Sequence, residues 1–145
     1  MTASLRAVEL VVAAAEAAAD KLAQHIQAFD VSERLAIIDA FMLASAPNDR
    51  QVKSIVDAIE DKLRSLGAKP LGREGQHEGR WVLLDYGDVV VHVQHAEERT
   101  FYGLERLWKD CPMIALPDYV TAGDRDEFDL ADPEGPTRAA AAGGA

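Results

Sequence analysis

Residues 81–94 place the tightest constraint on the fold, because they have the pattern of two short apolar strands joined by a tight turn. The strands cover residues 81–86 (WVLLDY) and 89–94 (VVVHVQ), with Gly87 and Asp88 between them. Gly87 supplies the positive φ that a two-residue hairpin turn requires. The sequence therefore predicts an antiparallel pair of strands here, and any sheet that the chain builds must contain it.

Three stretches have apolar residues at the three- and four-residue steps of amphipathic helices. The first covers residues 3–24 and is rich in alanine, a strong helix former. The second opens at Asn48, which has capping-box spacing with Gln51, and it ends at Gly67, a residue type that tolerates the left-handed conformation of many helix ends. The third runs from about Ala96 to Lys109, and we expect its apolar side to be buried, namely Phe101, Leu104, Leu107 and Trp108.

Several other segments have the pattern of strands. Residues 25–31 alternate as a strand does, and residues 35–45 form a longer apolar run typical of a central strand buried on both faces. A short strand is also expected near residues 69–71, inside a glycine-punctuated loop over 68–80. Helices thus interleave with strands, and one pair of strands is antiparallel. The predicted fold class is α/β, a mixed β-sheet flanked by helices on both faces.

Composition and charge exclude several kinds of protein. The chain has 25 acidic and 15 basic residues, and its net charge of −10 argues against general nucleic-acid binding and favours a basic partner. Its single cysteine, Cys111, cannot form a disulfide within the chain, which suits a reducing compartment. No apolar run approaches the roughly 20 residues that a membrane span needs. We therefore expect a cytoplasmic protein with no membrane partner.

The last part of the chain differs from the rest. Residues 117–145 contain seven Asp or Glu against two Arg, and they end in alanine and glycine. Low apolarity and charge of one sign predict disorder. The expected organisation is one folded domain over residues 1–116, followed by a disordered acidic tail over residues 117–145.

No reaction centre is evident in the sequence. Asp85 and Asp88 come nearest to a carboxylate pair that could hold a catalytic metal, but the hairpin turn between them need not bring them together. His92 is expected in a strand and His95 at its exit, so the two imidazoles should face different ways and chelate no metal. No glycine-rich loop precedes the second helix to hold phosphate. We predict no catalytic residue, metal or cofactor, and a nucleotidyltransferase-like enzyme is the less favoured alternative.

The last predicted helix has the residue mix of a protein-binding surface. Beside its apolar side lie an aromatic residue and several charged ones: Tyr102, Glu105 and Lys109, flanked by Arg99 and Arg106. Tyr102 is either a half-buried spacer or an anchor that fills a partner's pocket while the charges set the register. Trp81 also has two interpretations, because a tryptophan at the start of a strand serves either the core or an interface.

Two runs in the second half of the chain match a known pattern. Residues 74–93 contain EG followed by GRWVLLDYGDVVVHV, and residues 98–108 read ERTFYGLERLW. The chain resembles the Iojap family of ribosomal silencing factors, and the resemblance extends over about residues 3–112. It departs from the family pattern at Ala46–Asp49, where relatives often have a Gly-Ser-rich stretch, and at Gly103 inside the last helix. The matching positions are Trp81, Asp85, Gly87, Asp88, His92, Arg99, Tyr102, Leu104, Glu105, Leu107 and Trp108.

The resemblance implies a fold and a function. Family members have an α/β/α fold like that of nucleotidyltransferases but lack the catalytic carboxylates. They bind the large ribosomal subunit through ribosomal protein L fourteen and sterically block joining of the small subunit, which represses translation under nutrient limitation. A role in large-subunit assembly is the alternative, homodimer formation is a further expectation, and no direct sequence-specific nucleic-acid binding is expected. The partner-binding residues that the resemblance implies are Trp81, Asp85, Arg99, Tyr102, Glu105, Arg106 and Lys109.

Overall fold

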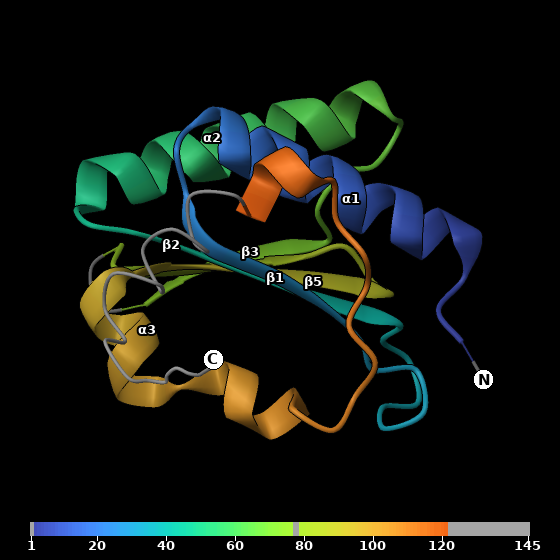
Figure 1. Cartoon of the computed structure of the whole chain (residues 1–145). Helices are drawn as coiled ribbons and strands as arrows, with labels where there is room; N and C mark the ends of the chain where they lie inside the picture. The colour runs from blue at the N-terminus through green and yellow to red at the C-terminus, as the bar shows by residue number, and fades with distance from the viewer. Residues whose placement is uncertain (1, 77–78, 122–145) are drawn as a thin grey trace.

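The computed structural model describes residues 2–76 and 79–121, and in these ranges the chain forms three layers (Figure 1). A five-stranded sheet lies in the middle. Two long helices, α1 (Leu5–Asp20) and α2 (Asp49–Ser65), cover one face. The short helix α3 (Ala96–Tyr102) and the 3-10 helix η1 (Leu104–Trp108) cover the other. The predicted α/β class, with helices on both faces of the sheet, is confirmed.

The sheet is mixed, with the strand order β1-β2-β5-β4-β3. Its strands are β1 (Gln24–Asp30), β2 (Ala40–Ala46), β3 (Gly72–Gln76), β4 (Trp81–Asp85) and β5 (Val89–His95). Only β2 and β5 run parallel to each other, and the other three pairings are antiparallel. The predicted hairpin is β4–β5: the Tyr86 N–H donates to the Val89 carbonyl at 2.9 Å, and Gly87 between them has φ of +93°.

The larger core lies between the sheet and the two long helices. The apolar stripe predicted for the second helix is buried as expected, and its fully buried members are Val52, Ile55, Val56, Ile59 and Leu63. α1 contributes mostly alanines, whose small side chains let the helix pack closely on α2 and on the sheet. The central strands β2 and β5 are buried almost throughout, since each has a helix layer on either side.

The start of α2 is capped as the sequence predicts, with one difference. The Asn48 Oδ1 atom accepts a hydrogen bond from the backbone N–H of Gln51 at 2.9 Å, which satisfies one free donor of the first turn. In a full capping box the Gln51 side chain would return to Asn48. Instead its amide nitrogen donates to the carbonyls of Lys21 and Leu22, at 2.9 Å and 3.2 Å. The side chain thereby joins the beginning of α2 to the end of α1.

Two strand predictions were wrong in their limits. The strand expected over 35–45 begins only at Ala40, because Leu35 and Ile38 fold over the second face of the sheet and pack there with buried Cys111. The strand expected at 69–71 lies instead at Gly72–Gln76, paired with β4. β3 is an edge strand made of glycine and charged or amide residues, so it lacks the apolar alternation by which strands are recognised.

The prediction of one continuous helix over residues 96–109 was also wrong, because the helix breaks at Gly103. This residue has φ of +53°, a left-handed conformation that glycine adopts without strain, and it ends α3 after Tyr102. The chain then turns into η1, so the apolar residues on either side of the break no longer share one face. A second, smaller core consists of Phe29, Val31, Leu43 and Cys111. Leu104 and Trp108 pack on it, whereas Phe101 and Leu107 are exposed.

After η1 the chain returns along the outer edge of β1 and reaches the α1 side (Figure 1). The Asp30 N–H donates to the Pro112 carbonyl at 2.8 Å, and the Ile114 N–H donates to the Ala28 carbonyl at 2.9 Å. Residues 118–121 form a helical turn whose Val120 belongs to the larger core. This turn falls in the stretch that the sequence assigns to the tail, and residues 122–145 of that tail lie outside the described residues. No helix within the described ranges is both long enough and apolar enough to cross a bilayer.

Candidate functional site

A row of aromatic rings runs across the second face of the sheet, beneath α3 and η1. The ring centroids of Trp108 and Phe41 are 5.0 Å apart, and those of Phe41 and His92 are 5.3 Å apart. The row continues from His92 to Trp81 at 6.0 Å and from Trp81 to Tyr102 at 4.9 Å. Three strands therefore supply a continuous aromatic floor on which the α3–η1 segment rests.

His92 and Trp81 are fixed to each other within this floor. The Trp81 Nε1–H donates a hydrogen bond to the His92 Nδ1 atom at 3.0 Å. His92 is only 7% exposed, and burial lowers the pKa of its imidazole from 6.5 to about 4, since the charged form loses its hydration. His92 is therefore neutral at physiological pH, with its proton on Nε2 and its Nδ1 lone pair used by Trp81.

Above the floor, three large side chains of the α3–η1 segment face solvent. Phe101 is 78% exposed, Leu107 is 60% exposed and Tyr102 is 40% exposed. The rings of Phe101 and Tyr102 meet edge to face, with centroids 4.9 Å apart. Exposed basic residues of the same segment are Arg106 and Lys109. We call these five residues the α3–η1 surface, and an exposed apolar group beside charged residues is typical of a protein-binding site.

Arg99 and Glu105, two of the predicted partner-binding residues, form an ion pair with each other. The Arg99 Nε atom lies 3.0 Å from a carboxylate oxygen of Glu105, and its Nη2 donates to the Gln27 side chain at 2.8 Å. The Arg99 side chain is 8% exposed and that of Glu105 is 34% exposed. This pair spans Gly103, so it braces the corner between α3 and η1.

Asp85, also a predicted partner-binding residue, lies apart from the others. It ends β4, the strand that Trp81 begins, and its Oδ1 accepts a hydrogen bond from the Gly87 N–H at 2.8 Å. The carboxylate therefore stabilises the hairpin turn. The structure brings together Trp81, Tyr102, Arg99, Glu105 and the basic residues of η1, and it leaves Asp85 at the opposite end of the strand.

His92 and His95 lie in different surroundings. His92 is buried in β5, whereas the His95 Nδ1 atom accepts the N–H of Glu97 at the start of α3. Among residues 2–76 and 79–121, no group of three or more His, Cys, Asp or Glu side chains is placed to hold a metal ion.

Phe101 and Leu107 are the residues that the sequence analysis missed, because it counted both as buried helix positions. The signal that could have found them is Gly103. A glycine within an apolar helical pattern is a candidate helix end, and a break there rotates the next turn relative to the last. An ideal Cβ built on Gly103 lies 2.9 Å from the guanidinium carbon of Arg106, so the basic side chain packs directly over the break.

Known proteins share this sequence and this fold. The family model described as "Ribosomal silencing factor during starvation" matches residues 4–141. The ribosomal silencing factor RsfS of Bacillus subtilis is 43% identical over 103 residues, which cover 71% of this chain and 87% of that protein. The chloroplastic Iojap protein of Zea mays is 32% identical over 109 residues, which cover 73% of this chain and 46% of that protein.

A solved structure agrees with the sequence matches. The crystal structure of a Chromobacterium violaceum protein superposes with a TM-score of 0.66 at 36% identity, covering 70% of this chain and 84% of that one. At this TM-score and identity, the two chains share a fold over most of their length. On these grounds the chain belongs to the family of ribosomal silencing factors.

Proposed function

We propose that this protein binds the large ribosomal subunit through ribosomal protein L fourteen and prevents the small subunit from joining, so that translation falls when nutrients are limiting. Family membership supports the ribosome as the partner. The observation that carries the choice of surface is the exposure of Phe101, Tyr102 and Leu107 on one short segment. Inhibition of this kind needs occupancy of a site and no bond-making step.

The α3–η1 surface has the properties of a binding hot spot. Large aromatic and apolar side chains contribute most of the energy at protein interfaces, and charged residues around them set the orientation. Here Phe101, Tyr102 and Leu107 are the proposed anchors, and Arg106 and Lys109 form a charged rim. The net charge of −10 attracts the protein as a whole towards a basic ribosomal protein.

The other predicted site residues take supporting roles in this proposal. Trp81 lies below Tyr102 and limits the directions in which its ring can point. Arg99 and Glu105 keep the α3–η1 corner in shape through their ion pair, in which the Arg99 side chain is buried. Asp85 is not part of the proposed contact, because it is engaged in the turn after β4.

Co-sedimentation with purified large subunits tests the proposal. We expect Tyr102→Ala to weaken binding by about 2 kcal/mol, roughly 30-fold, because it removes a central anchor. Tyr119→Ala is the matched control. Tyr119 is 57% exposed and lies beside Glu16 and Asp20 of α1, on the other side of the sheet, so this variant should bind normally.

A second measurement addresses inhibition itself. Wild-type protein added to separated small and large subunits should reduce the joined-ribosome peak in a sucrose gradient, and Tyr102→Ala should reduce it less. Binding without any effect on joining would contradict the steric mechanism and favour the assembly role. Ribosome profiles of growing and starved cells lacking the protein would then separate silencing from assembly, and light scattering would test the predicted homodimer.

A further inference from the structure

A cleft of about 450 Å³ lies at the start of α2, on the face of the sheet opposite the α3–η1 surface. Its lining comes from α2, from β3 and from the beginning of β4: Asp49, Arg50, Lys53, Arg73, Gly79 and Val82. A second hollow of about 410 Å³ shares Arg50 and Lys53, and its other charged residues are Lys21, which follows α1, and Asp57 and Asp61 of α2. Neither hollow contains a residue of the surface proposed to contact the ribosome.

Positive charge dominates the lining of the first cleft. Three of its side chains are cationic (Arg50, Lys53 and Arg73) and one is anionic (Asp49), which leaves a formal excess of two positive charges. The chain as a whole carries −10, so this is a local reversal of sign. The cleft also lies at the amino end of a 17-residue helix, where the helix dipole adds a partial positive charge.

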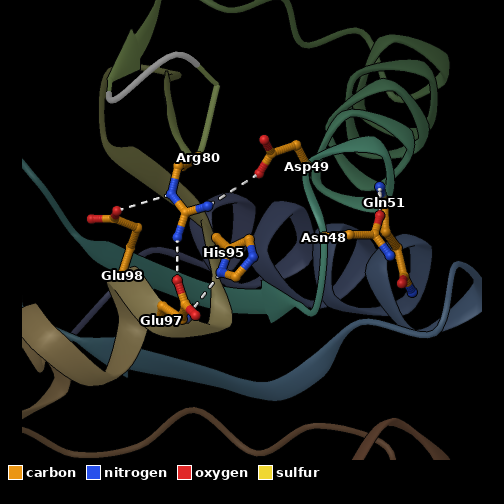
Figure 2. A network of polar contacts seen from close by, with 7 residues as sticks. All are labelled: Asn48, Asp49, Gln51, Arg80, His95, Glu97 and Glu98. Atoms are coloured by element: carbon orange, nitrogen blue, oxygen red, sulfur yellow. Dashed lines mark hydrogen bonds and ion pairs between the residues drawn. The ribbon is translucent and has the colours of Figure 1, made fainter.

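The one carboxylate of the lining is directed towards another partner. An oxygen of Asp49 lies 3.8 Å from the Arg80 guanidinium (Figure 2). Arg80 is itself held by Glu98 at 3.1 Å and by Glu97 at 2.7 Å, and these hydrogen bonds raise its pKa. Arg80 therefore stays charged and in place, and it is the cation that Asp49 faces.

The three cations of the cleft are available to a ligand. Lys53 pairs with Asp57 at 3.1 Å and Arg73 pairs with Glu60 at 3.0 Å. The Lys53–Asp57 pair is solvent-exposed, and such pairs contribute about 1 kcal/mol or less, so Lys53 exchanges readily for a ligand. Glu60 is only 15% exposed, so Arg73 keeps this partner and offers a ligand the guanidinium N–H groups that Glu60 does not use. Arg50 makes no ion pair with any residue in the described part of the chain.

A glycine of β3 lies beside the cleft. Gly75 pairs with Val82 of β4, so a side chain at position 75 would project on the same side of the sheet as Val82, which lines the cleft. A Cβ atom built on Gly75 meets nothing within 4 Å. Glycine inside a strand often marks a place where a ligand approaches the backbone closely.

We propose that this cleft binds a small polyphosphate anion. Three cations from two elements can each meet a separate phosphate oxygen, and hydrogen bonds between charged partners are the strongest that side chains form. A compact anion competes with the carboxylates paired to two of these cations, Asp57 and Glu60, while charges further away are screened over about 8 Å at physiological ionic strength. A nucleic-acid strand would extend past the cleft onto further carboxylates such as Glu97, which would repel it.

Isothermal titration calorimetry tests this proposal. The full chain is titrated with inorganic tripolyphosphate and, separately, with ATP in the absence of magnesium. Saturable binding of either probe is expected. Arg50→Gln and Arg73→Gln should each weaken it about tenfold, since each removes one charge-assisted hydrogen bond. The matched control is Arg34→Gln, because Arg34 pairs with Asp110 on the other side of the sheet, and this variant should bind as the wild type does.

The proposal would be overturned if neither probe bound at millimolar concentration. It would also be overturned if Arg34→Gln weakened probe binding as much as Arg50→Gln and Arg73→Gln do. The third contrary outcome is that a short single-stranded RNA binds more tightly than the probes at the same phosphate concentration. Circular dichroism of each variant confirms that the fold is intact. Arg50→Gln and Arg73→Gln should still co-sediment with large subunits, so failure here is distinguishable from failure of the proposed ribosome contact.

Discussion

The Trp81 indole donates its N–H to the His92 Nδ1 atom at 3.0 Å, across two neighbouring strands of the sheet. The same indole meets the ring of Tyr102, whose other side reaches solvent. A buried hydrogen bond thus orients the ring that supports an exposed residue of the α3–η1 surface. The stability and the binding properties of the protein are linked through this pair.

Replacing His92 tests that link. His92→Leu removes the acceptor of the Trp81 N–H, and loss of this partly buried hydrogen bond should lower the free energy of unfolding by about 1–3 kcal/mol. His92→Asn places an oxygen close to the position of Nδ1 and should lose less. Urea unfolding followed by tryptophan fluorescence gives the free energy of unfolding of both variants. Equal losses of stability would show that the hydrogen bond does not contribute to it.

The stability of the protein should depend on pH through His92. Burial lowers the folded-state pKa of the imidazole to about 4, whereas the unfolded chain has the ordinary value of 6.5. Between these values the unfolded state binds more protons, so stability is complete above pH 6.5 and falls as the pH decreases towards 4, by about 3 kcal/mol in all. Urea unfolding at several pH values should show this slope in the wild type. His92→Asn should lack it, and an unchanged slope in that variant would assign it to other groups.

Gly103 should not tolerate a side chain. Gly103→Ala forces a left-handed conformation on alanine and brings a Cβ to 2.9 Å from the Arg106 guanidinium, and we expect a loss of about 1–2 kcal/mol. The control is Gly72→Ala, since Gly72 has no positive φ and its Cβ would meet nothing within 4 Å. Thermal unfolding compares the two variants, and similar melting temperatures would mean that the α3–η1 corner does not need the left-handed residue.

The ion pair between Arg99 and Glu105 should respond asymmetrically to substitution. Glu105→Leu leaves a cation whose side chain is only 8% exposed, and uncompensated buried charges cost about 3–5 kcal/mol. Arg99→Met leaves a carboxylate that is 34% exposed and can take up water, so the loss should be smaller. Urea unfolding of both variants decides the order. A larger loss for Arg99→Met would mean that packing of the arginine stem outweighs the charge.

Leu107 should matter for binding and not for folding. Leu107→Ser changes a side chain that is 60% exposed, so the unfolding free energy should shift by no more than about 0.5 kcal/mol, while co-sedimentation with large subunits should weaken. Leu5→Ser is the matched control, because Leu5 is 90% exposed at the start of α1, away from the proposed contact. Equal co-sedimentation of the two variants would remove Leu107 from the surface.

Local patterns predicted much of the fold because they report which side of an element is buried. The stripe from Val52 to Leu63 and the turn at Gly87 appear in the structure as the sequence indicates. β3 was misplaced because an edge strand with exposed side chains carries no apolar alternation. At the candidate site, Tyr102 and Trp81 lie together, Arg99 is buried, and Phe101, which was expected on the buried side of a continuous helix, is exposed.

By itself, the sequence determined the layered α/β architecture and the family, since apolar periodicity and ordered motifs are local properties of the chain. Only the tertiary structure decided which residues of the last helical segment face solvent. A single left-handed glycine redirects η1, and the ion pair across it holds Arg99 in a buried position. Periodicity assumes a continuous helix, so it cannot report the consequences of a break that packing against the sheet stabilises.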